Sequence, residues 1–429
     1  MNNWVFVTDI EKERFNEPAF NENVKSHFLG SYEWGELSAQ NNWTPMYVGV
    51  EEDGRLIATA LLLRKMLLKG YNYVYIPRGY TADYSNKELL KFMTENIVRM
   101  LRKQKTVFFE IDPDIKLHTL DIEGNVVEGE ENSELVEFLK ELGFRHKPLT
   151  YLFEGRQPRF TFRIPLDGEM ENIEARYSRT TRTRIKKSLA NEVEVYKGDA
   201  EDIDEFIRLM KMTEARQDFF SHEYDYYRRL YDTLHPSDMV DLYLGRIDVE
   251  ALRAKVRGEL EREKADFAKY ENSDSKSAEK KRKEIEKRIT ACEGRLAELD
   301  SKDETNPIVS AYIITKYDDK AWALFAANDM DYSKFFANYA VYRQQLRDTH
   351  ADGRRIFDVF GTVGDTESAG NAAGLYEFKK KWGGEFTEFI GEFIYVLDPL
   401  MYFVYEKLIP IRHRIINKSL RKKVQESAE

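Results

Sequence analysis

The chain has 429 residues, of which 42% are hydrophobic and 33% are charged, and its formal net charge at pH 7 is -10. This composition excludes disordered and fibrous classes, and the length exceeds the ~250 residues at which a single core usually stops growing, so two domains are expected. The negative charge argues against broad, sequence-independent binding of nucleic acid, which depends on many Lys and Arg side chains against phosphates.

The segments that would direct export, bind metal or cross a membrane are not evident. Residues 1–13 contain acidic side chains and no unbroken apolar stretch, so we expect a cytoplasmic protein. The single cysteine, Cys292, excludes an internal disulfide, and the histidines lack metal-ligand spacing, so we expect no metal. The most apolar segment begins at Phe393, but Asp398 and Pro399 interrupt it, which argues against a spanning helix.

The first ~145 residues predict a layered α/β domain, because apolar strand-like runs alternate with helical spacing. The strands are expected at 46–49, 56–63, 71–76 and 107–111, and the helices at 87–103 and 134–142. After Pro148 the order starts again with a strand at 159–164, a basic helix at 174–189, a strand at 193–196 and a helix at 203–213. We interpret this order as two similar units, although no residue-level repeat is visible.

From residue 248 to 300 the chain becomes rich in Glu, Lys, Arg and Ala. Its second half carries apolar residues at heptad-like spacing: Ala278, Ile285, Ile289, Cys292, Leu296 and Leu299. A polar break at 272–275 predicts the tip of an antiparallel coiled-coil hairpin. Cys292 fits this stripe better than a nucleophile role, since no histidine is near it in sequence. After the hairpin we expect strands at 308–315 and 321–327 and helices at 337–348 and 373–382. The strands before and after the hairpin are each too few for a stable sheet, so we interpret the hairpin as an insertion in a single domain.

Three short motifs lie near the start, at the beginning of the second predicted domain and near the end of the chain. They are YEWGE at 32–36, QPRFTF at 157–162 and LYEFK at 375–379. Together with EIDP at 110–113, RTRIKK at 182–187 and the coiled coil, they resemble the FemABX family of tRNA-dependent peptidyltransferases over nearly the whole chain. Some members carry a basic residue shortly after the Trp-Gly pair. Here Glu36, Leu37 and Ser38 follow that pair, so one substrate contact is lost or moved.

The resemblance implies an α/β (α+β) fold class with two GNAT-like domains and an inserted antiparallel coiled-coil hairpin, as in the long-arm FemA type. We expect residues 1–146, completed by 398–429, to form the first domain. The second domain is expected to combine 147–247 with 304–397, and the arm is expected at 248–303.

The resemblance also implies an aminoacyltransferase that moves an amino acid from aminoacyl-tRNA to the side-chain amine of a peptidoglycan stem peptide, or to a growing bridge. Aminoacyl-tRNA is then a co-substrate, and no cofactor is expected. The implied acceptor is a lipid-linked or nucleotide-linked muropeptide precursor. A homo- or hetero-dimer with related transferases is a further candidate assembly.

Three residues are candidates for the chemistry. The resemblance assigns Lys379 to the oxyanion and the ester, and Phe378 to packing around it, whereas the lysine run at 379–381 alone would indicate a solvated helix face. Asp112 is a candidate proton acceptor or anchor for the substrate amine, because it follows a strand where loops commonly carry function. An Asp before Pro is equally typical of an ordinary turn.

Five further residues are candidates for substrate binding. Arg216 and Tyr339 resemble family positions along the precursor groove, where they would hold phosphate or sugar; a surface ion pair and a core aromatic are the alternatives. Trp34 belongs to the first motif. The basic helix at 174–189 predicts a local site for tRNA phosphate or precursor pyrophosphate. Arg182 and Lys186 share one face of that helix, while Arg176, Arg179 and Thr183 share another.

Two other functions were weighed. An acyl-CoA-dependent N-acyltransferase has the GNAT fold, but the chain lacks the expected loop pattern of Arg or Gln, then Gly three residues on and Gly or Ala five residues on. A non-enzymatic adaptor would use the coiled-coil arm to recruit a partner. The hairpin charges are more typical of a solvated coiled-coil face than of a tRNA site.

The C-terminal segment is basic, in contrast with the rest of the chain. From Lys407 onward, basic residues surround Leu408, Ile411, Ile415 and Leu420 at helical spacing. This pattern predicts an amphipathic helix in peripheral contact with the inner membrane surface, since polybasic segments gain ~1 kcal/mol per Lys or Arg at an anionic surface. The alternative is a terminal helix that packs on the first domain.

Overall fold

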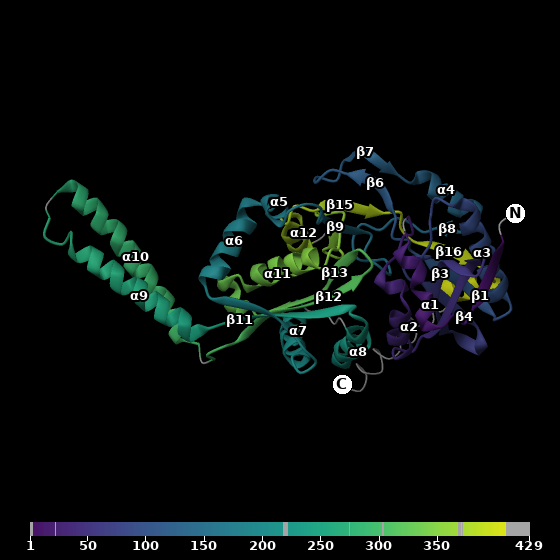
Figure 1. The fold of residues 1–429 in the computed structure, drawn as a ribbon, viewed down its shortest axis with the longest axis horizontal. Coiled ribbons are helices and arrows are strands. Elements are labelled where there is room, and N and C mark those ends of the chain that lie inside the picture. The colour runs from purple at the N-terminus through teal and green to yellow at the C-terminus, as the bar shows by residue number, and fades with distance from the viewer. Residues whose placement is uncertain are drawn as a thin grey trace, which may run out of the picture.

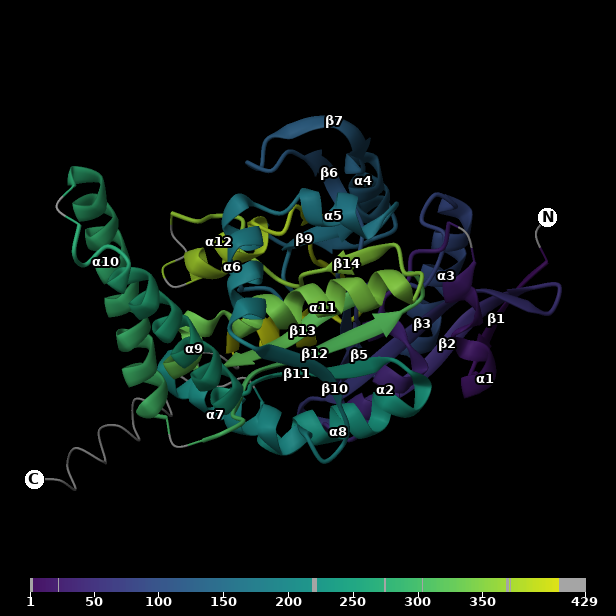
Figure 2. The same ribbon diagram turned by 60° about the vertical axis from the view of Figure 1, so that its left-hand side comes forward.

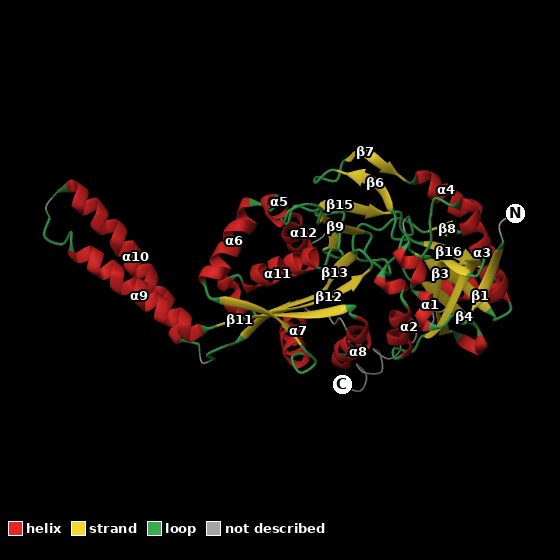
Figure 3. Ribbon diagram, in the orientation of Figure 1, coloured by secondary structure: helices red, strands yellow, loops and turns green. Residues whose placement is uncertain are grey.

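The computed structural model describes residues 3–21, 23–217, 222–273, 275–302, 304–367, 370 and 372–408. The chain forms two mixed α/β units around two sheets, and a long helical arm projects from one end (Figure 1, Figure 3). The unit that contains the N-terminus lies at the end opposite the arm.

The first sheet has strand order β1-β2-β3-β4-β5-β16-β8, in which β4 and β5 are parallel and the remaining neighbours are antiparallel. Its strands are β1 (Trp4–Thr8), β2 (Thr44–Glu52), β3 (Arg55–Met66), β4 (Asn72–Ile76), β5 (Thr106–Ile111), β8 (Arg145–His146) and β16 (Phe393–Val396). The helices of this part are α1 (Lys12–Phe15), α2 (Tyr32–Ala39), α3 (Lys87–Arg102) and α4 (Ser133–Glu141). Helix α3 buries Leu90, Met93 and Ile97 in the same apolar cluster as sheet residues, which accounts for its helical apolar spacing.

The second sheet has order β10-β11-β12-β13-β14-β9-β15-β6-β7. Its strands are β6 (Lys116–Leu120), β7 (Val126–Glu131), β9 (Phe160–Pro165), β10 (Val193–Gly198), β11 (Val240–Ile247), β12 (Ile308–Tyr317), β13 (Lys320–Asn328), β14 (Ile356–Asp358) and β15 (Glu385–Phe389). Alternate residues of β12 enter two clusters: Tyr312 joins α11 (Ala337–Ala351), and Ile313 joins α7 (Ile203–Gln217) and α8 (Tyr224–Leu234). Helices therefore cover both faces of this sheet, as Figure 2 also shows.

Strand pairing crosses the predicted domain boundaries in two places. Strands β6 and β7 lie within 1–146 but join the second sheet through β15, and β16 lies within 304–397 but joins the first sheet beside β5. The reason is local, because β15 and β16 are separated only by residues 390–392 and each strand pairs in a different sheet. The two units are therefore joined by shared strands as well as by side-chain contacts.

The arm consists of α9 (Val249–Ala268) and α10 (Lys276–Asp300), and it projects from the molecule in both ribbon views. Its inner stripe buries Ile285, Cys292 and Leu299, as the heptad-like spacing predicted. The arm connects β11 to β12, which are antiparallel neighbours in the sheet. The predicted insertion of a hairpin into the second domain is therefore seen directly in the strand order.

The prediction of one basic helix at 174–189 is wrong. The structure has α5 (Met170–Ala175) followed by α6 (Arg179–Ala190). Ser178 separates them because its Oγ accepts the backbone N–H of Thr181 at 3.1 Å, an N-cap that starts a new helix. Arg176 precedes this cap, so it does not share a face of one helix with Arg179 and Thr183.

The C-terminal prediction lies mostly outside the described residues, which end at 408. Helix α13 (Pro399–Phe403) and the π-helical turn Val404–Leu408 are described. Tyr402 and Tyr405 place their ring centroids 5.3 and 4.9 Å from that of Phe108 in β5, so this part of the segment packs on the first sheet. Within the described ranges, every helix falls short of the length or apolarity needed to cross a membrane.

Candidate active site

Lys379 lies at the end of α12 (Ala372–Lys380) with its amine turned toward protein backbone. Its Nζ donates hydrogen bonds to the carbonyl oxygens of Phe360 at 2.8 Å and Gly361 at 2.6 Å. Burial of the amine lowers the pKa of Lys379 to about 7, and the nearby charge of Asp358 opposes this shift. Protonated and neutral forms are therefore both accessible near neutral pH, unlike those of a solvated lysine.

The two carbonyls that hold Lys379 belong to a constrained loop at the end of β14. Phe360 has φ of 58°, a left-handed value that is uncommon for non-glycine residues. Gly361 packs so closely on Pro158 that a Cβ atom there would overlap the proline ring. The buried carboxylate of Asp358 stabilises this loop by accepting the backbone N–H of Phe360 at 2.8 Å.

A pocket of about 450 Å³ begins beside the residue that precedes Lys379. Phe378, Tyr339, Arg184 and Arg216 all line it, although they come from different helices. The Arg184 guanidinium lies over the rings of Phe336 and Tyr339, at 5.5 and 5.2 Å from their centroids, and it donates to the Tyr339 hydroxyl. The structure therefore brings together three predicted residues, Phe378, Arg216 and Tyr339, in a cationic and aromatic pocket suited to an anion.

Asp112 lines a separate pocket of about 260 Å³ between the two units. One carboxylate oxygen accepts the backbone N–H of Arg78 at 2.7 Å, and the other accepts the Tyr75 hydroxyl at 2.9 Å. Burial raises the pKa of Asp112 to about 6, against the opposing charge of Arg78. A carboxyl group with this pKa can accept a proton near neutral pH.

A small cavity of about 10 Å³ adjoins the Asp112 pocket. It shares Arg78, Pro158 and Phe389 with the Asp112 pocket, and it is also lined by Phe360 and Gly361, whose carbonyls hold Lys379. Pro158 therefore contacts the loop that holds Lys379 and also lines the Asp112 pocket.

The remaining predicted residues lie elsewhere. Trp34 packs edge-on against Phe28, with ring centroids 5.4 Å apart, in the apolar contact between α2 and the second unit. Arg182 is exposed and donates to the Ala175 carbonyl at 2.7 Å, and Lys186 is also exposed. Arg184 is the residue of this basic helix that reaches the pocket, and sequence reasoning did not single it out.

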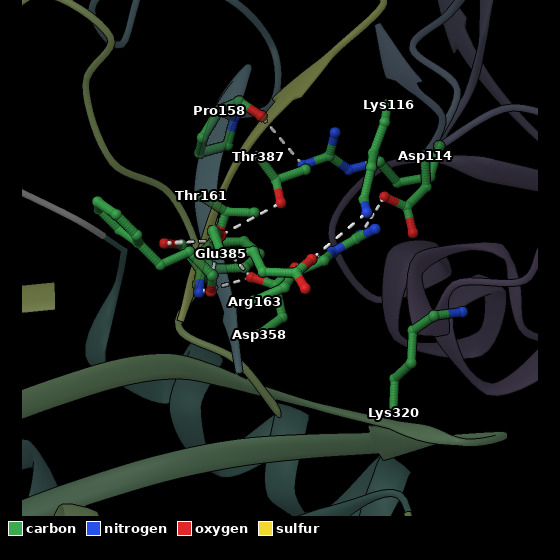
Figure 4. Close-up of polar contacts among 12 residues, drawn as sticks. Asp114, Lys116, Pro158, Thr161, Arg163, Lys320, Asp358, Glu385 and Thr387 are labelled. Carbon is green, nitrogen blue, oxygen red and sulfur yellow. Dashed lines mark hydrogen bonds and ion pairs between the residues drawn. The ribbon is translucent and has the colours of Figure 1, made fainter. Parts of the chain in front are cut away.

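Sequence reasoning also missed Arg163, which bridges the two units (Figure 4). Its Nε donates to Asp358 at 2.9 Å and its Nη2 donates to Asp114. Phe389 lies between two guanidinium groups, at 4.9 Å from that of Arg163 and 4.7 Å from that of Arg78. A signal was available in strand 159–164, where Arg159, Thr161 and Arg163 alternate with apolar residues and so share one face.

A metal centre is not evident in this part of the molecule. Among the residues that the structure describes, no group of three or more His, Cys, Asp or Glu side chains is arranged to hold a metal ion.

Two mixed α/β units with a coiled-coil arm, and a desolvated lysine that follows a residue of a cationic pocket, are the features that fold and site present for a two-domain transferase. The FemAB family model matches residues 10–409, and the chain belongs to this family. The family, the fold class and the transferase class expected from sequence are thereby confirmed.

Individual relatives match over almost their full length. The protein named lipid II:glycine glycyltransferase from Staphylococcus aureus strain COL is 28% identical over 421 residues, which cover 94% of this chain and 96% of that protein. The protein of the same name from strain USA300 matches equally, at 28% identity over 421 residues. The crystal structure of FemX superimposes with a TM-score of 0.77 and 26% identity, covering 94% of this chain and 100% of FemX.

Proposed function

We propose that this protein transfers an amino acid from aminoacyl-tRNA to an amine of the peptidoglycan precursor, either on the stem peptide or on a growing bridge. The observation that carries the proposal is the placement of Lys379, a desolvated amine with a pKa of about 7 whose preceding residue, Phe378, lines a cationic and aromatic pocket. The staphylococcal relatives are named for lipid II and glycine, which supports a lipid-linked acceptor and glycine as the transferred residue.

The reaction is an aminolysis of an ester. The acceptor amine attacks the aminoacyl carbonyl carbon, a C–N bond forms and the ester C–O bond breaks. The amine loses a proton, and the ribose oxygen of the tRNA gains one. No covalent enzyme intermediate is needed, because attacking amine and leaving group can be held in one site.

Four residues of the site are assigned roles in this reaction. Protonated Lys379 retains N–H capacity beyond its two backbone acceptors, and we assign it to stabilise the oxyanion and to supply the proton to the ribose oxygen. Asp112, with its pKa near 6, is assigned to receive the proton of the acceptor amine. Arg184 and Arg216 are assigned to phosphate groups of the substrates, because guanidinium pairs with phosphate in a bidentate manner.

The test is a transfer assay with purified protein. The protein is incubated with a mixture of radiolabelled aminoacyl-tRNAs and, in separate reactions, with lipid-linked or nucleotide-linked precursor. We expect label to enter the lipid-linked precursor from glycyl-tRNA. Absence of label from both precursors, with acyl transfer from acetyl-CoA instead, would establish the N-acyltransferase alternative.

A peripheral membrane contact is proposed for the basic C-terminal segment, since a lipid-linked acceptor lies at a membrane surface. We expect weak, salt-sensitive binding to anionic vesicles that decreases when Arg421, Lys422 and Lys423 are changed to Gln. Equal sedimentation of the wild-type protein and this variant with the vesicles at low salt would refute the contact.

A further inference from the structure

Asp358 lies within a set of polar contacts that includes Thr161 and Arg163 (Figure 4). It is 2% exposed, and its carboxylate accepts hydrogen bonds from Thr161 Oγ1 at 2.5 Å and Arg163 Nε at 2.9 Å, in addition to the backbone N–H of Phe360. A buried carboxylate with this many donors is fixed in one orientation. The Phe360 backbone that follows it is therefore fixed as well.

The same contacts extend to the segment that carries Asp112. Arg163 pairs with both Asp358 and Asp114, and Asp114 is separated from Asp112 only by Pro113. The positive charge of Arg163 holds the pKa of Asp114 well below its usual range. One guanidinium thus connects the loop that holds Lys379 to the strand end that holds Asp112.

We infer that Asp358 is a positioning residue for Lys379: it fixes the Phe360 and Gly361 carbonyls that hold the amine, and it places a negative charge near that amine. The inference rests on the proposed function, because it gives Lys379 its role as a cation. Asp358 acts through Lys379 and the loop and is not assigned a contact with substrate.

The charges around Lys379 support this assignment. Asp358 is the charged group that raises the pKa of Lys379 against burial. On α12 itself, Lys380 pairs with Glu123 and Lys381 pairs with Glu377. Asp358 in turn pairs with Arg163, which also pairs with Asp114. Loss of the Asp358 charge should therefore lower the Lys379 pKa further.

The experiment uses two variants that separate charge from hydrogen bonding. Asp358→Asn removes the charge, whereas Thr161→Val removes one hydrogen bond and leaves the charge. The alkaline limb of the pH dependence of kcat/KM should move to lower pH in Asp358→Asn, with a loss of kcat/KM at pH values above the limb. It should stay in place in Thr161→Val. Glu174→Gln, which breaks the pairs with Arg343 and Arg347, is the matched control for loss of a structural ion pair and should leave the limb unchanged.

A second measurement does not depend on activity. The lysines are labelled with ¹³C and ¹⁵N during expression, and the Lys379 side-chain signal, identified by its absence in Lys379→Met, is titrated by NMR. We expect titration near pH 7 in the wild-type protein and lower in Asp358→Asn. An unchanged Lys379 titration in a folded Asp358→Asn variant would overturn the inference. If Asp358→Asn does not fold, a wild-type Lys379 that titrates like a free lysine would overturn it equally. Normal titration behaviour without any aminoacyl transfer would instead refute the proposed function alone.

Discussion

The Nζ atom of Lys379 lies 2.6 Å from the carbonyl oxygen of Gly361. Burial of the amine lowers the pKa of Lys379 to about 7, although the residue belongs to a run of three lysines. Its neighbour Lys380 is instead paired with Glu123 at the surface. Substitution of the two lysines should therefore have different effects on transfer.

Lys379→Met should lower turnover by roughly 10²-fold or more, which is the usual cost of removing an oxyanion donor. The free energy of unfolding should change little, because the variant also removes a desolvated amine. Steady-state transfer rates and thermal unfolding measure the two effects. Lys380→Met is the matched control and should retain near-normal turnover. Near-normal turnover in Lys379→Met as well would remove Lys379 from the mechanism.

Asp112 should impose an acid limb on the pH dependence of transfer. Its raised pKa of about 6 means that the carboxylate form, which accepts the proton, is lost as the pH falls through 6. kcat/KM should therefore decrease about tenfold per pH unit below 6. In Asp112→Asn, activity should be lower and this limb absent. If the acid limb persists unchanged in Asp112→Asn, the limb arises from another group.

Gly361→Ala should disturb the carbonyls that hold Lys379. The added Cβ atom would overlap Pro158, so the loop must shift, and we expect a loss of transfer of at least about tenfold, because misplacement by ~1 Å is costly to catalysis. Gly374→Ala is the matched control, since nothing lies within 4 Å of its Cβ position in α12. That control should keep its activity and gain about 0.5–1 kcal/mol of stability from improved helix propensity. Equal activity in both variants would show that the loop geometry is irrelevant to transfer.

Arg184→Met should weaken substrate binding, because Arg184 is the cation held by aromatic rings in the pocket beside Phe378. We expect KM for aminoacyl-tRNA or precursor to rise about tenfold and its salt dependence to become shallower. Arg182→Met changes an exposed residue of the same helix and should have little effect. If the two variants were indistinguishable, the pocket would not be a phosphate site.

The sequence was informative where local pattern and structure agree. Apolar spacing predicted α3 and the arm, because each buries one continuous stripe. It missed β6 and β7, since β7 is exposed throughout and lacks apolar alternation. It also merged α5 and α6, because the N-cap of Ser178 lies inside a continuous basic run.

The residues of the candidate site were also predicted only in part. Lys379 and Phe378 were found through a short motif, and the structure adds the desolvation that makes Lys379 unusual. The Arg163 and Asp358 pair was not predicted, because its members are 195 residues apart and only the strand order brings them together. Trp34 was selected from a motif, and its packing in an apolar cluster could not be read from spacing.

The most direct test of the account is a single-turnover reaction with glycyl-tRNA, labelled in the glycyl group, and lipid-linked precursor, in which tRNA deacylation and incorporation of label are measured together. Each deacylated tRNA should correspond to one glycyl group in amide linkage on the precursor, and both signals should fall together in Lys379→Met. Deacylation without incorporation, or incorporation that persists in Lys379→Met at the wild-type rate, would contradict the account.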